Sequence, residues 1–366
     1  MYTFAITNSL TGNRIVEVTS AVAGVRWTTR AHGVGDAEVS LNLRGTDLLS
    51  RSEWQSFTEH WSRTLVVSWN DVAVYAGLIC GDDWDAPTGV LKLQTVELRN
   101  ELSWRNVTGV SNYNPAGSLV VSGKSKQGMI AELLKAGLNR GDSSSYWNYP
   151  LDVGVADAGD HSKTYWHYEL QNVEELIQEW QNSEGGPDVH LQPEWRSGDL
   201  WWAAKYGAPR LAGATFEFSQ SAADSPVVGA RRKRDGRKIT TGTFVAGKGS
   251  EQDMRVGLGD PADSSKGLVV STPYRDRTVA YKQIDDLGQL NSLGLADVET
   301  HFRATVAKSF SLRITDDVHP GNLKIGSRVN VWTAGDEYES EGTFAGYLVG
   351  LSGGLDGSMG LELVPL

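Results

Sequence analysis

Cysteine is almost absent from this sequence, since the 366 residues contain only Cys80. A single cysteine excludes an intrachain disulfide and a zinc site built from several thiolates. No apolar run reaches the roughly 18 residues of a membrane-spanning helix, so no membrane insertion is expected. The opening segment MYTFAITNSLTGNRI lacks the basic and apolar regions of a signal peptide. We therefore expect synthesis and folding in the cytoplasm.

Basic residues are also scarce, with 34 Lys and Arg against 45 Asp and Glu and a net charge of −11. This balance argues against a general nucleic-acid binder, because such proteins gain affinity by neutralising phosphates. Proline is sparse at 11 residues and glycine abundant at 41, while 40% of the residues are hydrophobic. The chain is therefore predicted to be globular, with two or three domains and many tight turns.

A complete phosphate-binding loop is missing, although TTGTFVAGKGSEQDM at 240–254 resembles one. The position after Lys248 is Gly249, where a P-loop needs a hydroxyl for magnesium. The spacer residues Thr243–Ala246 are typical of a strand. We interpret the segment as a strand that runs into a glycine-rich turn, and no nucleotide cofactor is expected.

Other catalytic and metal-binding motifs are absent as well. No G-x-S-x-G motif occurs. His161 and His167 are six residues apart among aromatic residues, which favours packing over metal ligation. The segment GDDWD with Asp82, Asp83 and Asp85 lacks the distal glutamate of a calcium loop and is interpreted as a solvated turn. The residues thus predict no catalytic site, no metal and no cofactor.

Alternating apolar residues between glycine, asparagine and aspartate clusters predict a mainly β chain. Residues 1–105 are expected to form an antiparallel β-barrel, with a hairpin at TLVVSWNDVAVYAGLI and further strands at LKLQTVEL and VELRNEL. In this hairpin Leu65, Val67 and Trp69 are expected on one face. Residues 226–366 are expected to form a second barrel, with strands at SFSLRIT, SRVNVWTA, TFAGYLVGLS and MGLELVPL after a helix near 287–307.

The middle section, residues 106–225, is predicted to be α+β. Ser125 caps a helix whose apolar residues lie at 129, 130, 133, 134 and 138 and which stops by Gly141. Asn172 caps a second helix, with Val173, Leu176, Ile177 and Trp180 on one face and Gly185–Gly186 at its end. Short strands are expected at DVHLQPEW, DLWWAAKYG and ATFEFS.

Tryptophans are frequent in this middle section: Trp147, Trp166, Trp180, Trp195, Trp201 and Trp202. Tryptophan faces beside carboxylates can bind sugars, and Glu179, Glu184 and Glu194 are available, although hydrolysis needs two carboxyls at a fixed separation. Trp201 and Trp202 are the candidate sugar contacts. Tryptophans at such positions are more often buried in a core or an interface, so both interpretations stay open.

The segment ARRKRDGRKITT contains the strongest local charge. Between Arg231 and Lys238 there are six basic residues and one acidic residue, a local charge of +5. The six candidate contact residues are Arg231, Arg232, Lys233, Arg234, Arg237 and Lys238. Asp235–Gly236 at the centre indicates a hairpin tip. We expect this tip to dock onto a neighbouring acidic subunit, with non-specific DNA contact as the alternative.

Several weak motifs in order resemble the tail-tip hub proteins, or minor tail proteins, of long-tailed phages that infect actinobacteria, and more widely the baseplate hub family. The hairpin ends in the aromatic-x-Gly-apolar-Ile pattern at Tyr75, Gly77, Leu78 and Ile79. The FVAGKG stretch matches a strand and turn of that family. The late segment matches at Pro320, Gly321, Ile325, Gly326, Val329 and Val331, with Ser327 where aspartate is common.

This resemblance implies a structural virion protein at the tail tip, with no enzymatic activity. It implies two tube-like β-barrel domains per chain and a homotrimer that forms a pseudo-sixfold ring, which joins the tail tube to the tip and lets DNA pass. The implied partners are a distal tail protein, a tape measure protein and other minor tail or tip proteins. An acidic lumen wall would keep DNA from adhering. A carbohydrate-binding tip protein that contacts the host cell wall is the alternative.

Overall fold

The chain packs as two compact units, a larger one formed by residues 1–230 and 309–366 and a smaller one formed by residues 231–308. The computed structural model describes residues 1–44, 49–140, 147–154, 157–183, 185–260, 273–281 and 284–366. The chain is mainly β with helices in its middle section, as the alternation predicts. The domain limits expected near 105 and 225 stay predictions.

One antiparallel-rich sheet of 13 strands dominates the larger unit. Its order is β14-β18-β21-β20-β3-β4-β7-β6-β5-β1-β2, with β19 paired to β20 and β13 to β19. The strands from the first hundred residues are β1 (Tyr2–Asn8), β2 (Arg14–Glu17), β3 (Val22–Arg30), β4 (Asp36–Asn42), β5 (Arg63–Trp69), β6 (Val72–Asp85) and β7 (Val90–Glu97). The later strands are β13 (Thr215–Ser219), β14 (Val227–Asp235), β18 (Thr305–Arg313), β19 (Arg328–Thr333), β20 (Gly342–Gly354) and β21 (Ser358–Pro365).

The two ends of the chain meet where β3 pairs antiparallel with β20, in a register that joins Trp27 to Gly353. Trp27 is fully buried there, and a methyl group on Gly353 would lie 2.7 Å from its ring. The core beneath this junction contains Phe4, Val39 and Leu65 from the first strands and Val331 and Leu361 from the last. The strands of residues 1–105 and those of residues 226–366, which were expected to form two barrels, therefore lie in one sheet, and both groups contribute residues to one hydrophobic core.

The predicted β5–β6 hairpin is confirmed, with Asn70 and Asp71 as its turn. Both turn residues have positive φ, 46° and 64°, as the favoured two-residue hairpin turn requires. Leu65 and Val67 point into the core of the main sheet, and Trp69 packs against it. Val66, on the opposite face, belongs to a second core. Strand β5 is thus buried on both sides.

The second core lies under the middle section, where α2 (Lys126–Leu138) and α3 (Val173–Gln181) pack together. Both predicted helices are confirmed, and the side chains of Ser125 and Asn172 cap them by accepting backbone N–H groups. Two small sheets accompany the helices, β8 (Ser118–Lys124) with β10 (His161–Trp166), and β11 (Val189–Arg196) with β12 (Asp199–Tyr206) and β9 (Leu151–Asp152). Gly141, the expected end of the first helix, lies outside the described residues.

Two predicted boundaries are wrong. The segment expected to continue β7 is instead the 3₁₀ helix η2 (Leu98–Trp104), whose Leu98 and Leu102 are buried in the second core. The last predicted helix, α4 (Leu287–His301), ends before residue 305, where β18 begins. Further short turns of 3₁₀ helix occur at η1 (Thr19–Ala21), η3 (Val110–Asn112), η4 (His167–Glu169) and η5 (Glu251–Asp253), and a short helix, α1, at Arg51–Phe57.

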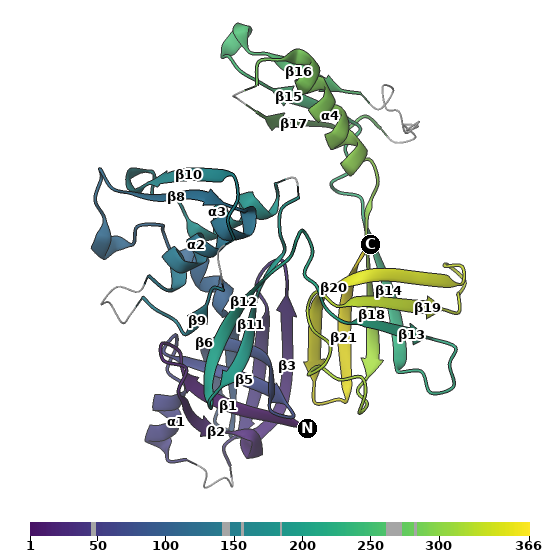
Figure 1. Ribbon diagram of the computed structural model, residues 1–366. Helices are drawn as coiled ribbons and strands as arrows, with labels where there is room; N and C mark the ends of the chain where they lie inside the picture. Colours follow the sequence, from purple (N-terminus) through teal and green to yellow (C-terminus); the bar gives the residue numbers. More distant parts are fainter. Residues whose placement is uncertain (45–48, 141–146, 155–156, 184, 261–272, 282–283) are drawn as a thin grey trace. The chain divides into compact units, whose positions relative to one another are not determined.

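The smaller unit consists of a three-stranded sheet covered on one face by α4 (Figure 1). Its strands are β15 (Gly242–Ala246), β16 (Val256–Gly259) and β17 (Asp276–Ala280). The P-loop-like segment is therefore a strand that runs into a turn, as predicted, and Gly249 in this turn has a φ of +108°. Helix α4 approaches closely, since a methyl group on Gly259 would lie 2.2 Å from the backbone of Gly294.

Candidate functional site

The basic stretch, residues 231–238, begins on β14 and continues into the segment that leads to β15. Its expected position at a hairpin tip is wrong. Strand β14 pairs with β18, whereas β15 pairs with β16 and β17. The Asp235–Gly236 turn does form locally, but the chain that returns beside β14 comes from about seventy residues later. Such pairing has no local sequence signal.

The side chains of the basic stretch are mostly exposed. Arg231, Lys233 and Arg234 are exposed, and Arg232 is partly buried. Successive strand residues point to opposite faces, so this part of β14 presents cations on both faces. None of these three exposed side chains forms an ion pair with a described residue.

One cation of the stretch is neutralised within it. Arg237 donates from Nε to Asp235 at 2.9 Å and 3.0 Å, and its guanidinium also bonds the same carboxylate from Nη2. Hydrogen bonds from the Arg237 side chain and backbone hold the pKa of Asp235 well below its ordinary value. Arg275 donates to the carbonyl oxygens of Arg237 and Ile239, both at 2.9 Å. These contacts fix the turn but leave most of the positive charge exposed.

The charge of the chain divides unevenly between its two units. Residues 231–308 contain 14 Lys and Arg and 10 Asp and Glu, a net charge of +4. The remaining residues contain 20 basic and 35 acidic side chains, a net charge of −15. The overall acidity of the sequence therefore belongs to the larger unit alone.

The two candidate sugar contacts on β12 differ sharply in exposure. Trp202 is 1% exposed within the second core, which leaves its ring no face for a ligand. Trp201 is partly buried, and the guanidinium of Arg196 lies 5.4 Å from the centre of its ring. Trp201 is the only one of the pair that a sugar could reach.

A more exposed aromatic pair lies elsewhere in the middle section. The rings of Trp166 and Tyr168 stack with centres 6.0 Å apart, and their side chains are 41% and 57% exposed. Val120 lies on the same face of the β8–β10 sheet, since Thr164 is its register partner and Trp166 is two residues further on. Trp166 is one of the six tryptophans of the middle section but not one of the two candidate sugar contacts, Trp201 and Trp202. The alternation of β10, with buried Tyr165 beside it, is the signal that was available.

The glutamates considered for hydrolysis are engaged in ion pairs. Glu179 accepts from Lys163 at 3.0 Å. Glu194 contacts Lys205 at 3.0 Å and Arg196 at 3.2 Å. Partial burial opposes ionisation of Glu194, but these hydrogen bonds outweigh it and keep its pKa below the ordinary value. A general acid needs the opposite shift. Glu184 lies outside the described residues.

The histidines considered as metal ligands have separate partners. His161 packs against Trp180 with ring centres 5.3 Å apart, and His167 Nδ1 lies 3.2 Å from Thr108 Oγ1. Within the part of the chain that the structure describes, no group of three or more His, Cys, Asp or Glu side chains could hold a metal ion. No helix in that part is long and apolar enough to cross a membrane.

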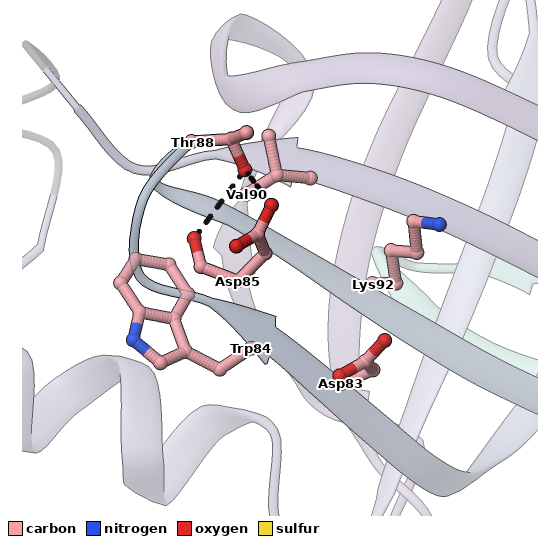
Figure 2. Close-up of a pocket in the computed structure, with 6 residues that line it drawn as sticks. All are labelled: Asp83, Trp84, Asp85, Thr88, Val90 and Lys92. Carbon is pink, nitrogen blue, oxygen red and sulfur yellow. Dashed lines mark hydrogen bonds between the residues drawn. The ribbon is translucent and has the colours of Figure 1, made fainter.

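The acidic segment at 82–85 borders an open pocket of about 540 Å³ near the β6–β7 turn (Figure 2). Asp83 lies opposite Lys92 in the strand register, and Trp84 is 50% exposed. Thr88 Oγ1 donates to Asp85 Oδ2 at 2.6 Å, which ties the turn together. The expected solvated turn is thus a strand end with one exposed ring, two carboxylates and one ammonium group.

Comparisons with known proteins give a likeness of fold. No family model matches the sequence, and no curated protein matches it. The 43 kDa tail protein of prophage MuSo2 from Shewanella oneidensis is 11% identical and matches over 99% of this chain and 98% of its own, with a TM-score of 0.58. A tail protein from Neisseria meningitidis MC58 is 14% identical over 99% and 96% of the chains, with a TM-score of 0.54.

A chain of the Francisella PdpA–VgrG complex is also similar, at 9% identity and a TM-score of 0.56. It matches over all of this chain but only 57% of its own length. Identities this low carry the fold and nothing finer. Along its whole length, the chain has the fold of the tail proteins from Shewanella oneidensis and Neisseria meningitidis.

Proposed function

We propose that this protein is a structural component of a phage tail tip. The observation that carries the proposal is the whole-chain likeness to two tail proteins, which leaves almost no part of either chain unmatched. The sequence also resembles the tail-tip hub proteins of actinobacteriophages. The proposed location is the virion, at the tip of the tail.

The ring itself is the finer part of the proposal. Three copies would form a pseudo-sixfold collar that joins the tail tube to the tip and lets DNA pass without sequence-specific binding. Two groups of strands per chain support this role: the early strands β1–β7 and the late strands β18–β21 lie in one sheet and meet where β3 pairs with β20. The charge of −15 on the larger unit supports a lumen wall that repels DNA phosphates. Distal tail, tape measure and other tip proteins would be its neighbours.

A direct test combines mass and location. Sedimentation equilibrium of the purified protein should give three times the chain mass of 39.8 kDa. Labelled antibodies should mark the distal end of the tail in imaged virions of the phage that encodes the chain. A stable dimer would contradict the ring. Virions that lack the protein would overturn the structural role altogether.

Contact with cell-wall glycan is the second candidate function, and the exposed Trp166–Tyr168 stack favours it. Aromatic faces bind sugar rings by stacking, and these two rings are open to solvent. If they do so, Trp166→Ala should reduce co-sedimentation with purified host cell walls by about tenfold. Trp104→Ala is the matched control, since Trp104 is 75% exposed but not part of the stack. Equal binding by both variants and the wild type would exclude a glycan site at this stack.

A further inference from the structure

The uneven charge of the two units has a consequence for how copies of the chain associate. The smaller unit carries +4 and its basic stretch alone carries +5, whereas the larger unit carries −15. Opposite charge on two surfaces accelerates their encounter and stabilises their contact. Every copy of this chain therefore carries both a cationic surface and the acidic surface that complements it.

The backbone at the basic stretch is open as well. Strand β14 is the terminal strand of the 13-stranded order, so one of its edges has no partner strand within the described sheet. Arg231 and Lys233 share one face of this strand, and Arg234 lies on the other. A partner surface would therefore meet cations from either side.

The larger unit supplies dense acidic segments. The loop between β19 and β20 has four carboxylates in six residues, at positions 336, 337, 339 and 341, and no basic residue. A second segment is Asp82, Asp83 and Asp85 at the exposed end of β6. At that end, β6 extends beyond the register that pairs it with β5, which stops at Leu78.

We infer that the basic stretch of one copy binds the acidic larger unit of a second copy. The inference rests on the proposed function, because a ring requires copies to touch, and it specifies the surface by which they do so. The two copies use different surfaces, the basic stretch of one and the acidic larger unit of the other. Such a contact is head-to-tail, the kind that can close into rings. DNA fits this surface less well, because the chain as a whole carries −11 and the stretch has no interleaved aromatic residues for base stacking.

Sedimentation velocity of the full chain at about 50 mM and about 500 mM salt tests the inference, since salt screens such contacts. The variant Arg231→Glu, Lys233→Glu, Arg234→Glu should weaken self-association by about tenfold or more at low salt. The matched control reverses three exposed cations of the larger unit, Arg26, Arg51 and Lys135, and changes the net charge by the same amount. It should associate like the wild type. A triple glutamine variant of the stretch replaces the glutamate variant if the latter does not fold.

Cross-linking identifies the partner surface. A carbodiimide joins a lysine amine to a touching carboxylate, and a mixture of ¹⁴N- and ¹⁵N-labelled chains shows whether the bond joins two copies. Lys233 or Lys238 should cross-link to a carboxylate of the larger unit in mixed-isotope pairs. Cross-links confined to single-isotope pairs, or a wild type that is monomeric at every concentration, would overturn the inference.

Two further outcomes separate the inference from the proposed function. If the glutamate variant of the stretch and the control variant both form the same oligomer as the wild type, the basic stretch is not the joining surface, although the ring itself stands. If the wild type binds a short DNA duplex and only the glutamate variant loses that binding while its self-association is unchanged, the stretch contacts DNA and the inference is wrong.

Discussion

Replacing Trp202 with alanine should lower the free energy of unfolding of the larger unit by about 3–5 kcal/mol, the usual cost of deleting a buried tryptophan. The residue is 1% exposed in the second core and lies opposite Pro193 and beside Leu151 in its small sheet. Truncation would leave a cavity in the second core, where β11 of the same sheet packs on β6 and the neighbouring side chains are already buried. Urea denaturation followed by circular dichroism measures the difference.

Trp201→Ala is the matched control one residue away. Trp201 is partly exposed on the opposite face of β12, so the change should cost less than about 1 kcal/mol. Equal costs for the two variants would mean that β12 does not hold Trp202 inward. Cell-wall binding that falls in Trp201→Ala without loss of stability would instead favour a sugar contact at this strand.

Between about pH 4.5 and 6.5 the stability of the larger unit should change little, because two buried groups titrate in opposite directions. Burial raises the pKa of Glu97 from 4.5 to about 7, and hydrogen bonds from Thr29 and Gly35 reduce this rise only in part. Burial lowers the pKa of His190 from 6.5 to about 4. Each shift is worth about 3 kcal/mol over its window.

The two signs follow from proton binding. The folded chain keeps a proton on Glu97 that the unfolded chain loses above pH 4.5, so this group's stabilisation is lost as pH rises from 4.5 to about 7. The unfolded chain binds a proton on His190 below pH 6.5, whereas the folded chain binds it only below about pH 4. Stability therefore rises with pH from about 4 to 6.5. The lowered pKa values of Asp152 and Asp188 act below this range.

Removing one group should reveal the other. The variant Glu97→Gln keeps an acceptor for Gly35. Its free energy of unfolding should rise by about 3 kcal/mol as the pH increases from 4 to 6.5, because only His190 then titrates in this range. In the variant His190→Gln, the free energy of unfolding should fall by about the same amount as the pH increases from 4.5 to 7. Glu38→Gln, at an exposed position of β4, should leave the wild-type profile unchanged. A wild-type profile with a steep slope across this range, or a flat profile in both buried variants, would contradict the opposed pair.

Local chemistry accounts for the elements that were predicted well. The caps at Ser125 and Asn172 and the spacing of Leu133, Leu176 and Ile177 specify α2 and α3 without help from the rest of the fold. The Asn70–Asp71 turn fixes the β5–β6 hairpin in the same way. The segment after Glu97 was mistaken for a strand because burial in the second core, and not local propensity, turns it into a 3₁₀ helix.

The candidate surfaces depended far more on long-range contacts. Alternation shows that Trp201 and Trp202 face opposite ways, but it does not show which face is inward, since that depends on helices that lie elsewhere in the chain. The basic stretch was visible as a charge, yet its strand partner could not be inferred from the Asp235–Gly236 turn. The stacking of Trp166 on Tyr168 needs the turn η4 to bring the two rings together.

By itself, the sequence determined the mainly β class, the capped helices, the hairpin and the run of cations between Arg231 and Lys238, because each depends on residues that are neighbours along the chain. Only the tertiary structure decided that β3 pairs with β20 to join both ends in one sheet, and that 78 residues separate into a unit of opposite charge. The first outcome depends on pairing between segments hundreds of residues apart, where the gain from burying apolar side chains must exceed the entropy lost in closing such a long loop. The second depends on contacts among segments within those 78 residues, which also lie beyond the reach of local patterns.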